Sequence, residues 1–431
     1  MSLELITDEL FQEHIKKANR QFYEQSPQMA THLRKRGYRV QILAYVVEKE
    51  IQISAIVYSQ PIAGGYRMEL HNGPIVTDSA YLHDFFKQLM ELHNGPIVTD
   101  SAYLHDFFKQ LQDFAKTNNV IELVVKPYIP YQYFDSQGTP TSEPNDLFIE
   151  QLTSIGYTHS GLQRGFDSGD WYYLKDLSQL DSKTLLPSFN KNGQQLVKKA
   201  RGMGIQIEKL PKERLELFKA ITNETAERNG FLDKDLEYYH CIFDAFGEDA
   251  SFLSASIDFQ EYLNILLNEK ADYEQHQNQI ISDFGATPTG KKQKSKLANL
   301  NEQLRKIKET IEEVNRIIEK HGNGVTPLAV GLFAYLDKEA YYLHSGSSPE
   351  FCHFPAPSLL QEFVMLEAIK RGCQTYNFLC FSGQFDGKDG VLRFKQNFNG
   401  YIMRTPGVFT YLPRPYKYHF YRLVKKLLRR L

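Results

Sequence analysis

The sequence has almost no net charge, few cysteines and no long apolar run, and each of these absences limits what the protein can be. Its 50 lysines and arginines are balanced by 52 aspartates and glutamates, so no global field would gather nucleic acid, and any RNA contact must come from local patches. Four unevenly spaced cysteines among 431 residues argue against a disulfide framework or a zinc site. No stretch approaches the roughly 18 apolar residues of a membrane span, and the first residues lack the features of a signal peptide. These absences predict a cytoplasmic protein without a bound metal.

The length exceeds what one hydrophobic core normally organises, so we expect two domains. Strand and helix patterns run through residues 1–170 and then through a second, similar series in residues 171–400, with 401–431 expected to return to the first domain. Early in the chain we expect a helix over 7–23, and at the end of the first series a strand over 157–166. The two halves are interpreted as two copies of one α/β plan.

A perfect tandem repeat interrupts the first series. Residues 68–89 and 90–111 are identical at all 22 positions, and each copy contains a strand pattern followed by the start of a helix. Repeats maintained by packing diverge, so exact identity indicates a recent duplication or an artefact of the source sequence. We therefore expect one strand or helix half to be displaced to the surface.

Residues 258–322 form an insertion with a different pattern. Apolar residues alternate at steps of three and four across three heptads, which predicts two antiparallel helices paired as a coiled coil; those on the second helix are Leu297, Leu300, Leu304, Ile307, Ile311, Val314 and Ile318. The turn between the helices is followed by three lysines, Lys291, Lys292 and Lys294. An RNA contact through these lysines and a role in protein contacts or stability are equally compatible with the pattern.

The stretch 390–400 is the strongest candidate for a site. It follows an apolar strand and a glycine-rich turn, and it places Lys395 between Phe394 and Phe398. Glycines allow a ligand to approach the backbone, and a lysine partly removed from water has a charge that acts strongly. The alternative is that Lys395 is an ordinary solvated charge beside a core phenylalanine.

Other candidate residues have equally plausible structural interpretations. Tyr128 and Tyr131 lie in a proline-rich loop and would present rings to a substrate, or pack against the next strand. Lys35 and Arg36 form part of a basic cluster at the end of a predicted helix, where cations also favour the helix dipole. The tail, residues 414–431, has seven lysines and arginines among apolar residues; this pattern is typical of a helix on an anionic membrane surface, or of one packed on the first domain.

Four stretches together carry a resemblance to a known family. They are residues 376–400, residues 127–133 (Pro-Tyr-Ile-Pro-Tyr-Gln-Tyr), residues 196–205 and the helical insertion, in the same order as in the Fem/Mur (FemABX) aminoacyltransferases. These enzymes build branch peptides on bacterial peptidoglycan precursors, and the pattern is most similar to MurN-type members. The resemblance covers essentially the whole chain and implies an α/β fold of two GNAT-like domains, the second carrying the coiled-coil arm.

The resemblance also implies an activity and a set of site residues. It implies transfer of an amino acid from aminoacyl-tRNA to an amine of lipid-linked muropeptide, without a cofactor, at the membrane's inner face and beside partner transferases of the same family. Lys395, supported by Phe394, would be catalytic. The residues expected to bind substrate are Lys35, Arg36, Tyr128, Tyr131, Lys234, Tyr238, Tyr342 and His344; here Lys234 replaces an arginine and His344 an aromatic residue of the family. Lys291, Lys292 and Lys294 would contact RNA.

Two alternatives remain open from the sequence. A non-catalytic scaffold could use the arm and the basic tail to dock partner transferases at the membrane. A generic acyl-CoA acetyltransferase is a weaker alternative, because neither half has a clear glycine-rich pyrophosphate loop at the start of a helix. No carboxylate stands out as a general base, and His344 is the only histidine we consider for that role.

Overall fold

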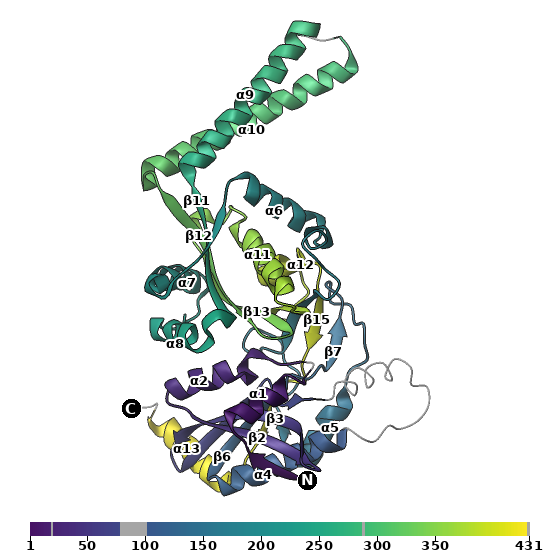
Figure 1. The fold of residues 1–431 in the computed structure, drawn as a ribbon, viewed down its shortest axis with the longest axis vertical. Coiled ribbons are helices and arrows are strands. Elements are labelled where there is room, and N and C mark those ends of the chain that lie inside the picture. The colour runs from purple at the N-terminus through teal and green to yellow at the C-terminus, as the bar shows by residue number, and fades with distance from the viewer. Residues whose placement is uncertain (19, 78–100, 287–288, 429–431) are drawn as a thin grey trace.

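The fold is built on two β-sheets joined end to end, with a helical arm projecting from the second sheet (Figure 1). The computed structural model describes residues 1–18, 20–77, 101–286 and 289–428. Each sheet has eight strands and helices on both faces, so the expected α/β class is confirmed.

The first sheet is mixed, and both of its faces are covered. Its strands pair in the order β1 (Ser2–Leu5), β2 (Arg39–Val47), β3 (Glu50–Ile62), β4 (Gly65–His71), β6 (Val120–Lys126), β16 (Phe409–Tyr411) and β8 (Thr158–His159), and β5 (Ile75–Val76) pairs with β3. Strands β2 and β3 form the expected hairpin through a two-residue turn at Glu48 and Lys49, both with positive φ, as a tight hairpin turn requires.

Alternation along these strands explains the two layers around the sheet. In β2, Leu43 and Tyr45 join a core beneath helices α4 and α5, while Ile42 joins a second core beneath α1 and α2, because successive side chains point to opposite faces. These helices are α1 (Asp8–Ile15), α2 (Pro27–Lys35), α4 (Ser101–Thr117) and α5 (Asp146–Ser154).

The tandem repeat supplies one strand and one helix to this domain, each from a different copy. Residues 68–71 of the first copy lie in β4, whereas α4 begins at Ser101 in the second copy. Phe107 and Phe108 of α4 are fully buried in the core of the first sheet. The predicted displacement of a strand or helix half concerns residues 78–100, which lie outside the described residues.

The second sheet is buried on both faces. Its order is β10 (Gln206–Lys209), β11 (Ala250–Asp258), β12 (Val325–Tyr335), β13 (Glu339–Ser347), β14 (Thr375–Cys380), β9 (Trp171–Asp176), β15 (Tyr401–Arg404) and β7 (Gln132–Phe134). Its helices are α6 (Lys191–Gly202), α7 (Leu215–Asn229), α8 (Leu236–Phe246), α11 (Ala356–Lys370) and α12 (Gly390–Gln396). Helices α7 and α8 cover one face, and α6, α11 and α12 cover the other.

The two sheets exchange strands across the boundaries expected from the sequence. Strand β7 comes from the first series but pairs with β15 in the second sheet, and β15 itself belongs to the segment 401–431 that was expected to return to the first domain. From that segment, β16 pairs within the first sheet and the following helix, α13 (Pro415–Leu428), packs on β6, so both of them return to the first domain. The domain boundaries at residues 170 and 400 stay predictions. Strands β7 and β15 were expected in the first domain and instead pair in the second sheet.

Two predicted elements are longer in the sequence than in the structure. Helix α1 ends at Ile15 rather than at residue 23, because the chain then leaves the first sheet and crosses to the second. The ring of Phe22 lies 4.5 Å from that of Tyr128 and 5.3 Å from that of Tyr341. The strand expected over 157–166 is limited to β8, Thr158–His159. We call residues 20–26 the crossing segment.

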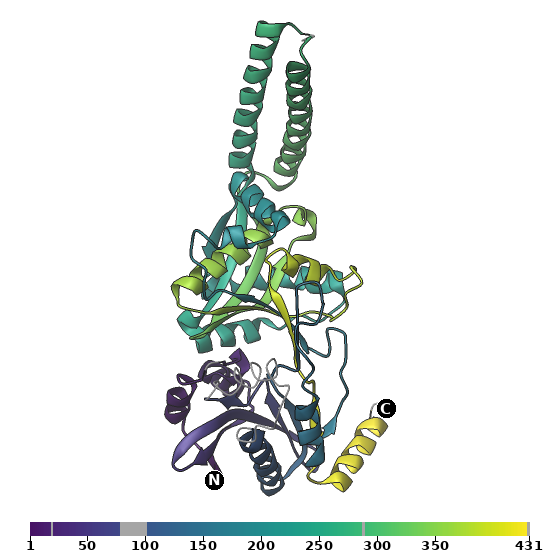
Figure 2. The ribbon, with the colours of Figure 1, turned by 90° about the vertical axis from the view of Figure 1, so that its right-hand side faces the viewer.

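The arm consists of α9 (Phe259–Phe284) and α10 (Lys291–His321), which run antiparallel and extend away from the second sheet (Figures 1 and 2). Residues at the predicted heptad positions are buried between them, namely Leu266, Ile280, Leu304, Ile307 and Val314. The helix pair thus follows the apolar pattern, and a supercoil of the two helices stays a prediction. Among the described residues, no helix is both long and apolar enough to cross a bilayer.

Candidate functional site

Lys395 lies on α12, the short helix that follows the glycine-rich turn. Asp389 caps this helix by accepting hydrogen bonds from the backbone N–H groups of residues 391 and 392, and it also accepts one from the Ser382 hydroxyl. The capping carboxylate therefore ties the helix to the end of strand β14. This arrangement fixes the position from which Lys395 reaches back towards the strand.

The Lys395 ammonium is buried and held by two main-chain oxygens. It is 3% exposed, and Nζ donates to the carbonyl of Leu379 at 3.0 Å and to that of Cys380 at 2.6 Å. Burial lowers the pKa of Lys395 to about 8, opposed by the nearby Cys380 and Asp389. A lysine with a pKa this close to neutrality can stabilise negative charge or exchange a proton under ordinary conditions.

The irregular end of β14 provides these two oxygens. Leu379 has a φ of +57°, a conformation rarely adopted by residues other than glycine. Its backbone N–H donates to Oδ1 of Asn377 at 2.8 Å, and the strand register shifts between Asn377 and Cys380. The strained backbone is thus stabilised by a buried amide, and it points two carbonyls at one ammonium.

Phe394 lies beside the lysine in the chain and packs on the phenylalanine one turn later. Its ring centre is 5.3 Å from that of Phe398, in an edge-to-face arrangement. Phe398 is fully buried and in turn contacts Phe378 of β14 and Phe189. The aromatic pair on either side of Lys395 was predicted correctly as a partly apolar setting for the charge.

A second cluster forms where the two sheets' helices meet. Arg36, at the end of α2, and Lys234, just before α8, both lie over the ring of Tyr238, at 5.8 and 5.5 Å from its centre. The Tyr238 hydroxyl is 3.3 Å from Nε2 of His344 on β13. Four of the residues expected to bind substrate are therefore brought together, although they come from distant parts of the chain.

The two rings of this cluster are uncharged at neutral pH. Burial, followed by the charge of Lys234, lowers the pKa of His344 to about 4, so the imidazole is neutral at pH 7. Burial raises the pKa of Tyr238, which therefore stays protonated. Arg36 also pairs with the exposed Asp235 at 3.1 Å, a contact that a stronger anion such as phosphate could replace. The two cations, Arg36 and Lys234, therefore lie against rings that are uncharged at pH 7.

Three other expected substrate-binding residues do not join this cluster. Lys35 points to Asp244, 3.9 Å away on α8. Tyr342 stacks on Phe333, with ring centres 5.2 Å apart, on the face of the sheet opposite His344. A register shift in the β12–β13 ladder between Leu332 and Phe333 separates them, since a bulge reverses the alternation of side chains. Tyr131 is buried and donates to Asp146 at 2.8 Å.

Tyr128 belongs to a buried polar group that sequence reasoning missed. Its hydroxyl donates to Oε1 of Glu339 at 3.0 Å, and Asn377 donates to the same oxygen at 2.7 Å. The Arg20 guanidinium lies 4.7 Å over the Tyr128 ring. Burial raises the pKa of Glu339, opposed first by Arg20. No local signal identifies this group, because Arg20 lies in the crossing segment and Glu339 at the start of a strand.

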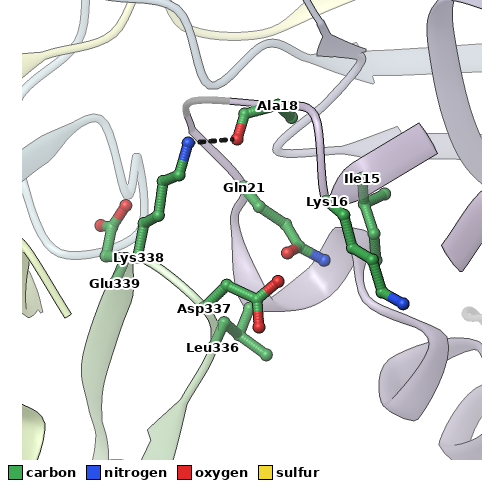
Figure 3. Close-up of a pocket in the computed structure, with 8 residues that line it drawn as sticks. All are labelled: Ile15, Lys16, Ala18, Gln21, Leu336, Asp337, Lys338 and Glu339. Carbon is green, nitrogen blue, oxygen red and sulfur yellow. Dashed lines mark hydrogen bonds between the residues drawn. The ribbon is translucent and has the colours of Figure 1, made fainter. Parts of the chain in front are cut away.

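A small pocket lies where the crossing region meets the turn between β12 and β13 (Figure 3). It is lined by Ile15, Lys16, Ala18, Gln21 and residues 336–339. Lys338 closes one side by donating to the carbonyl of Ala18 at 3.0 Å. None of the residues expected to be catalytic or to bind substrate lines this pocket, so we interpret it as a packing gap between the two domains.

The arm lysines lie far from both clusters. Lys291, Lys292 and Lys294 are exposed in the first turn of α10, at the end of the arm remote from the sheets (Figure 1). Any ligand that contacts them together with Lys395 must therefore span most of the second domain and the arm.

Comparison with known proteins gives concordant results. The profile described as the FemAB family matches residues 6–93 and 88–426, and each of these ranges contains one complete copy of the repeat. Aminoacyltransferase FemA of Staphylococcus epidermidis is 29% identical over 321 residues, covering 73% of this chain and 77% of that protein. FemA of Staphylococcus aureus is also 29% identical, over 73% and 76%. The crystal structure of FemX covers 98% of this chain and all of its own, with a TM-score of 0.69 and 19% identity. The more specific likeness to MurN-type proteins stays a prediction.

Proposed function

The chain belongs to the FemAB family, and on that premise we propose that it is an aminoacyltransferase of peptidoglycan branch synthesis. Its donor is aminoacyl-tRNA, and its acceptor is the free amine of a branch on lipid-linked muropeptide. The similar proteins named aminoacyltransferase FemA support the transferase class. We place the reaction in the cytoplasm, at the inner face of the membrane where a lipid-linked acceptor would be found.

The observation that carries this proposal is the joint placement of Arg36 and Lys234 over Tyr238. One cation comes from the first domain and the other from the second, so a phosphate bound between them would fix the acceptor across the domain junction. Arg36 can grip phosphate through two N–H groups, whereas Lys234 acts as a point charge. The neutral His344 keeps the Tyr238 hydroxyl oriented.

The chemistry needs alignment more than activation. The acceptor nitrogen attacks the ester carbonyl carbon, the new amide bond forms, and the bond to the ribose oxygen breaks. The proton lost by the amine ends on the departing ribose hydroxyl. Holding the two substrates in line can be worth about 7–11 kcal/mol, and Lys395 supplies positive charge for the oxyanion or the departing oxygen.

Lys395 suits this role because its charge is placed in advance. The two carbonyls of residues 379 and 380 hold Nζ on one side, leaving one of its three N–H groups for a substrate oxygen. Since the group is already removed from water, little reorganisation accompanies the reaction. The RNA part of the donor would extend along the second domain towards Lys291, Lys292 and Lys294.

The test is transfer of a labelled amino acid in a purified system. Lys395→Met should abolish labelling of the muropeptide while the far-UV circular dichroism and the unfolding midpoint stay close to those of the parent. Retained turnover would remove Lys395 from the mechanism. Binding of partner transferases without any transfer by the parent protein would favour the alternative, a docking scaffold.

A further inference from the structure

The last helix of the chain carries an apolar stripe on its outer face. Helix α13 (Pro415–Leu428) exposes Tyr416, Phe420, Leu423 and Leu427 by 91, 65, 56 and 56%. At about 100° per residue these four side chains fall within roughly 60° of the helix circumference. Large apolar side chains exposed in one line usually mark a surface that another body covers.

The opposite side of α13 is fastened to the first domain. Arg414, which immediately precedes the helix, donates to the Lys116 carbonyl at 3.1 Å and also to the side chain of Asn119. Tyr418 is half-buried beside Glu122 of β6, and this burial raises its pKa. The expectation that the helix packs on the first domain with a solvated basic face is therefore only half right, because the outward face is apolar.

The charges around the stripe indicate what covers it. Lys417 lies on one side of the stripe and Lys426 on the other, with Arg422 and Lys425 further round, and the helix contains no acidic residue. In a chain whose charges otherwise balance, this helix is a local basic surface. Apolar residues flanked on both sides by cations match the boundary between acyl chains and anionic headgroups.

We propose that the outer face of α13 docks on an anionic membrane surface and thereby brings the site to its acceptor. This inference rests on the proposed function, in which that acceptor is lipid-linked. The phenyl and leucyl side chains enter the headgroup boundary, while the lysines contact lipid phosphates. Both views place α13 on the outside of the first sheet and the arm at the opposite end of the molecule, so the arm would extend away from the membrane, where a bulky RNA has room.

The first test measures binding to vesicles in a sedimentation assay. Phe420→Ser with Leu423→Ser should weaken partition onto phosphatidylcholine vesicles containing about one third phosphatidylglycerol by about tenfold or more. Phe284→Ser with Leu147→Ser is the matched control, because Phe284 and Leu147 are 54 and 52% exposed elsewhere on the surface. The control should bind like the parent. Equal binding by the α13 variant and the parent would overturn the proposal.

The second test examines charge. Lys417→Gln with Lys426→Gln should reduce partition onto the same vesicles by about fivefold for each lysine, and raised salt should reproduce the loss. Lys292→Gln with Lys294→Gln, at the tip of the arm, should leave vesicle binding unchanged. If the arm-tip variant loses binding and the α13 variant does not, the arm contacts the membrane and our assignment is wrong.

Two further readouts separate this inference from the proposed function and from another occupant. With a soluble acceptor that lacks the lipid, the Phe420→Ser, Leu423→Ser variant should transfer as fast as the parent. Vesicle binding without any transfer would support docking and contradict the enzyme. If sedimentation velocity shows the parent as a dimer and this variant as a monomer, the stripe binds a second copy and the membrane assignment falls.

Discussion

The pKa of Lys395 leads to a quantitative prediction about the pH dependence of transfer. Burial lowers that pKa from 10.5 to about 8, and the mechanism uses the protonated form. The turnover rate should therefore fall as pH rises through about 8. Below that pH an acceptor α-amine, with an ordinary pKa near 8, becomes protonated and cannot attack. The expected profile is a bell with its maximum near pH 8.

The size of the alkaline decline follows from the same value. At pH 10 about one lysine in a hundred would keep its proton. At the maximum near pH 8 half of the lysines keep theirs and half of the amines are free, so the rate should drop about 25-fold from the maximum. Loss of the Lys395 proton would not lower the rate by unfolding the protein. Between pH 8 and 10.5 the unfolded chain binds the proton and the folded one does not, so stability rises across that window, by about 3 kcal/mol in total.

The assay is single-turnover transfer between pH 6 and 10, approximately the range that both pKa values require, with circular dichroism at each pH. Lys175→Met is a matched control: Lys175 is also 3% exposed, burial lowers its pKa to about 8, and it donates to the carbonyl of Asn399 at 3.3 Å rather than to the two carbonyls that hold Lys395. This variant should keep the bell. Lys395→Arg, whose charge persists, should retain weak activity without the alkaline decline. A rate that stays level or increases up to pH 10 in the parent would refute the role of Lys395 as a cation.

The remaining predictions concern acceptor binding and the repeat. Arg36→Ala and Lys234→Ala should each raise the KM for the acceptor about 10-fold or more with a smaller change in kcat. Tyr342→Phe should leave both constants near the parent values. Steady-state kinetics with varied acceptor distinguishes these outcomes, and an unchanged KM in Arg36→Ala would place the phosphate elsewhere. Deleting residues 79–100 should preserve both transfer and the thermal unfolding midpoint, because β4 and α4 remain; a lower midpoint would mean that the deleted residues contribute to folding stability.

The sequence predicted best those elements whose pattern is local and long. The heptads of α10 located the arm because an apolar stripe repeats over many turns, and the alternation in β2 and β3 located the hairpin. Helix α1 was extended too far because contacts with Tyr128 and Tyr341, which are distant in sequence, take the chain to the other sheet. Short strands such as β7 and β15 have too few residues for their sequence to indicate the sheet to which they belong, which is determined by tertiary packing.

The candidate site was predictable where a family pattern marked the residues, and otherwise not. Lys395, Arg36, Lys234 and Tyr238 could be named in advance, although only the structure brings the last three into contact. Alternation predicts that Tyr342 and His344 share one face of β13, whereas a bulge between them, which alternating residues do not reveal, places them on opposite faces. A role of Tyr342 in substrate binding stays a prediction. The buried hydrogen bonds from Tyr128 and Asn377 to Glu339 likewise depend on contacts between segments that are remote in the sequence.

The position of β16 has a consequence for how the polypeptide acquires its shape during synthesis. This strand, near the end of the chain, lies between β6 and β8 and is the neighbour through which β8 joins the sheet. A nascent chain emerges from the ribosome in order, so the first half must wait with an open edge until residues 409–411 have been translated. Proteolysis of ribosome-bound intermediates would show that half becoming resistant only when the final strand is released.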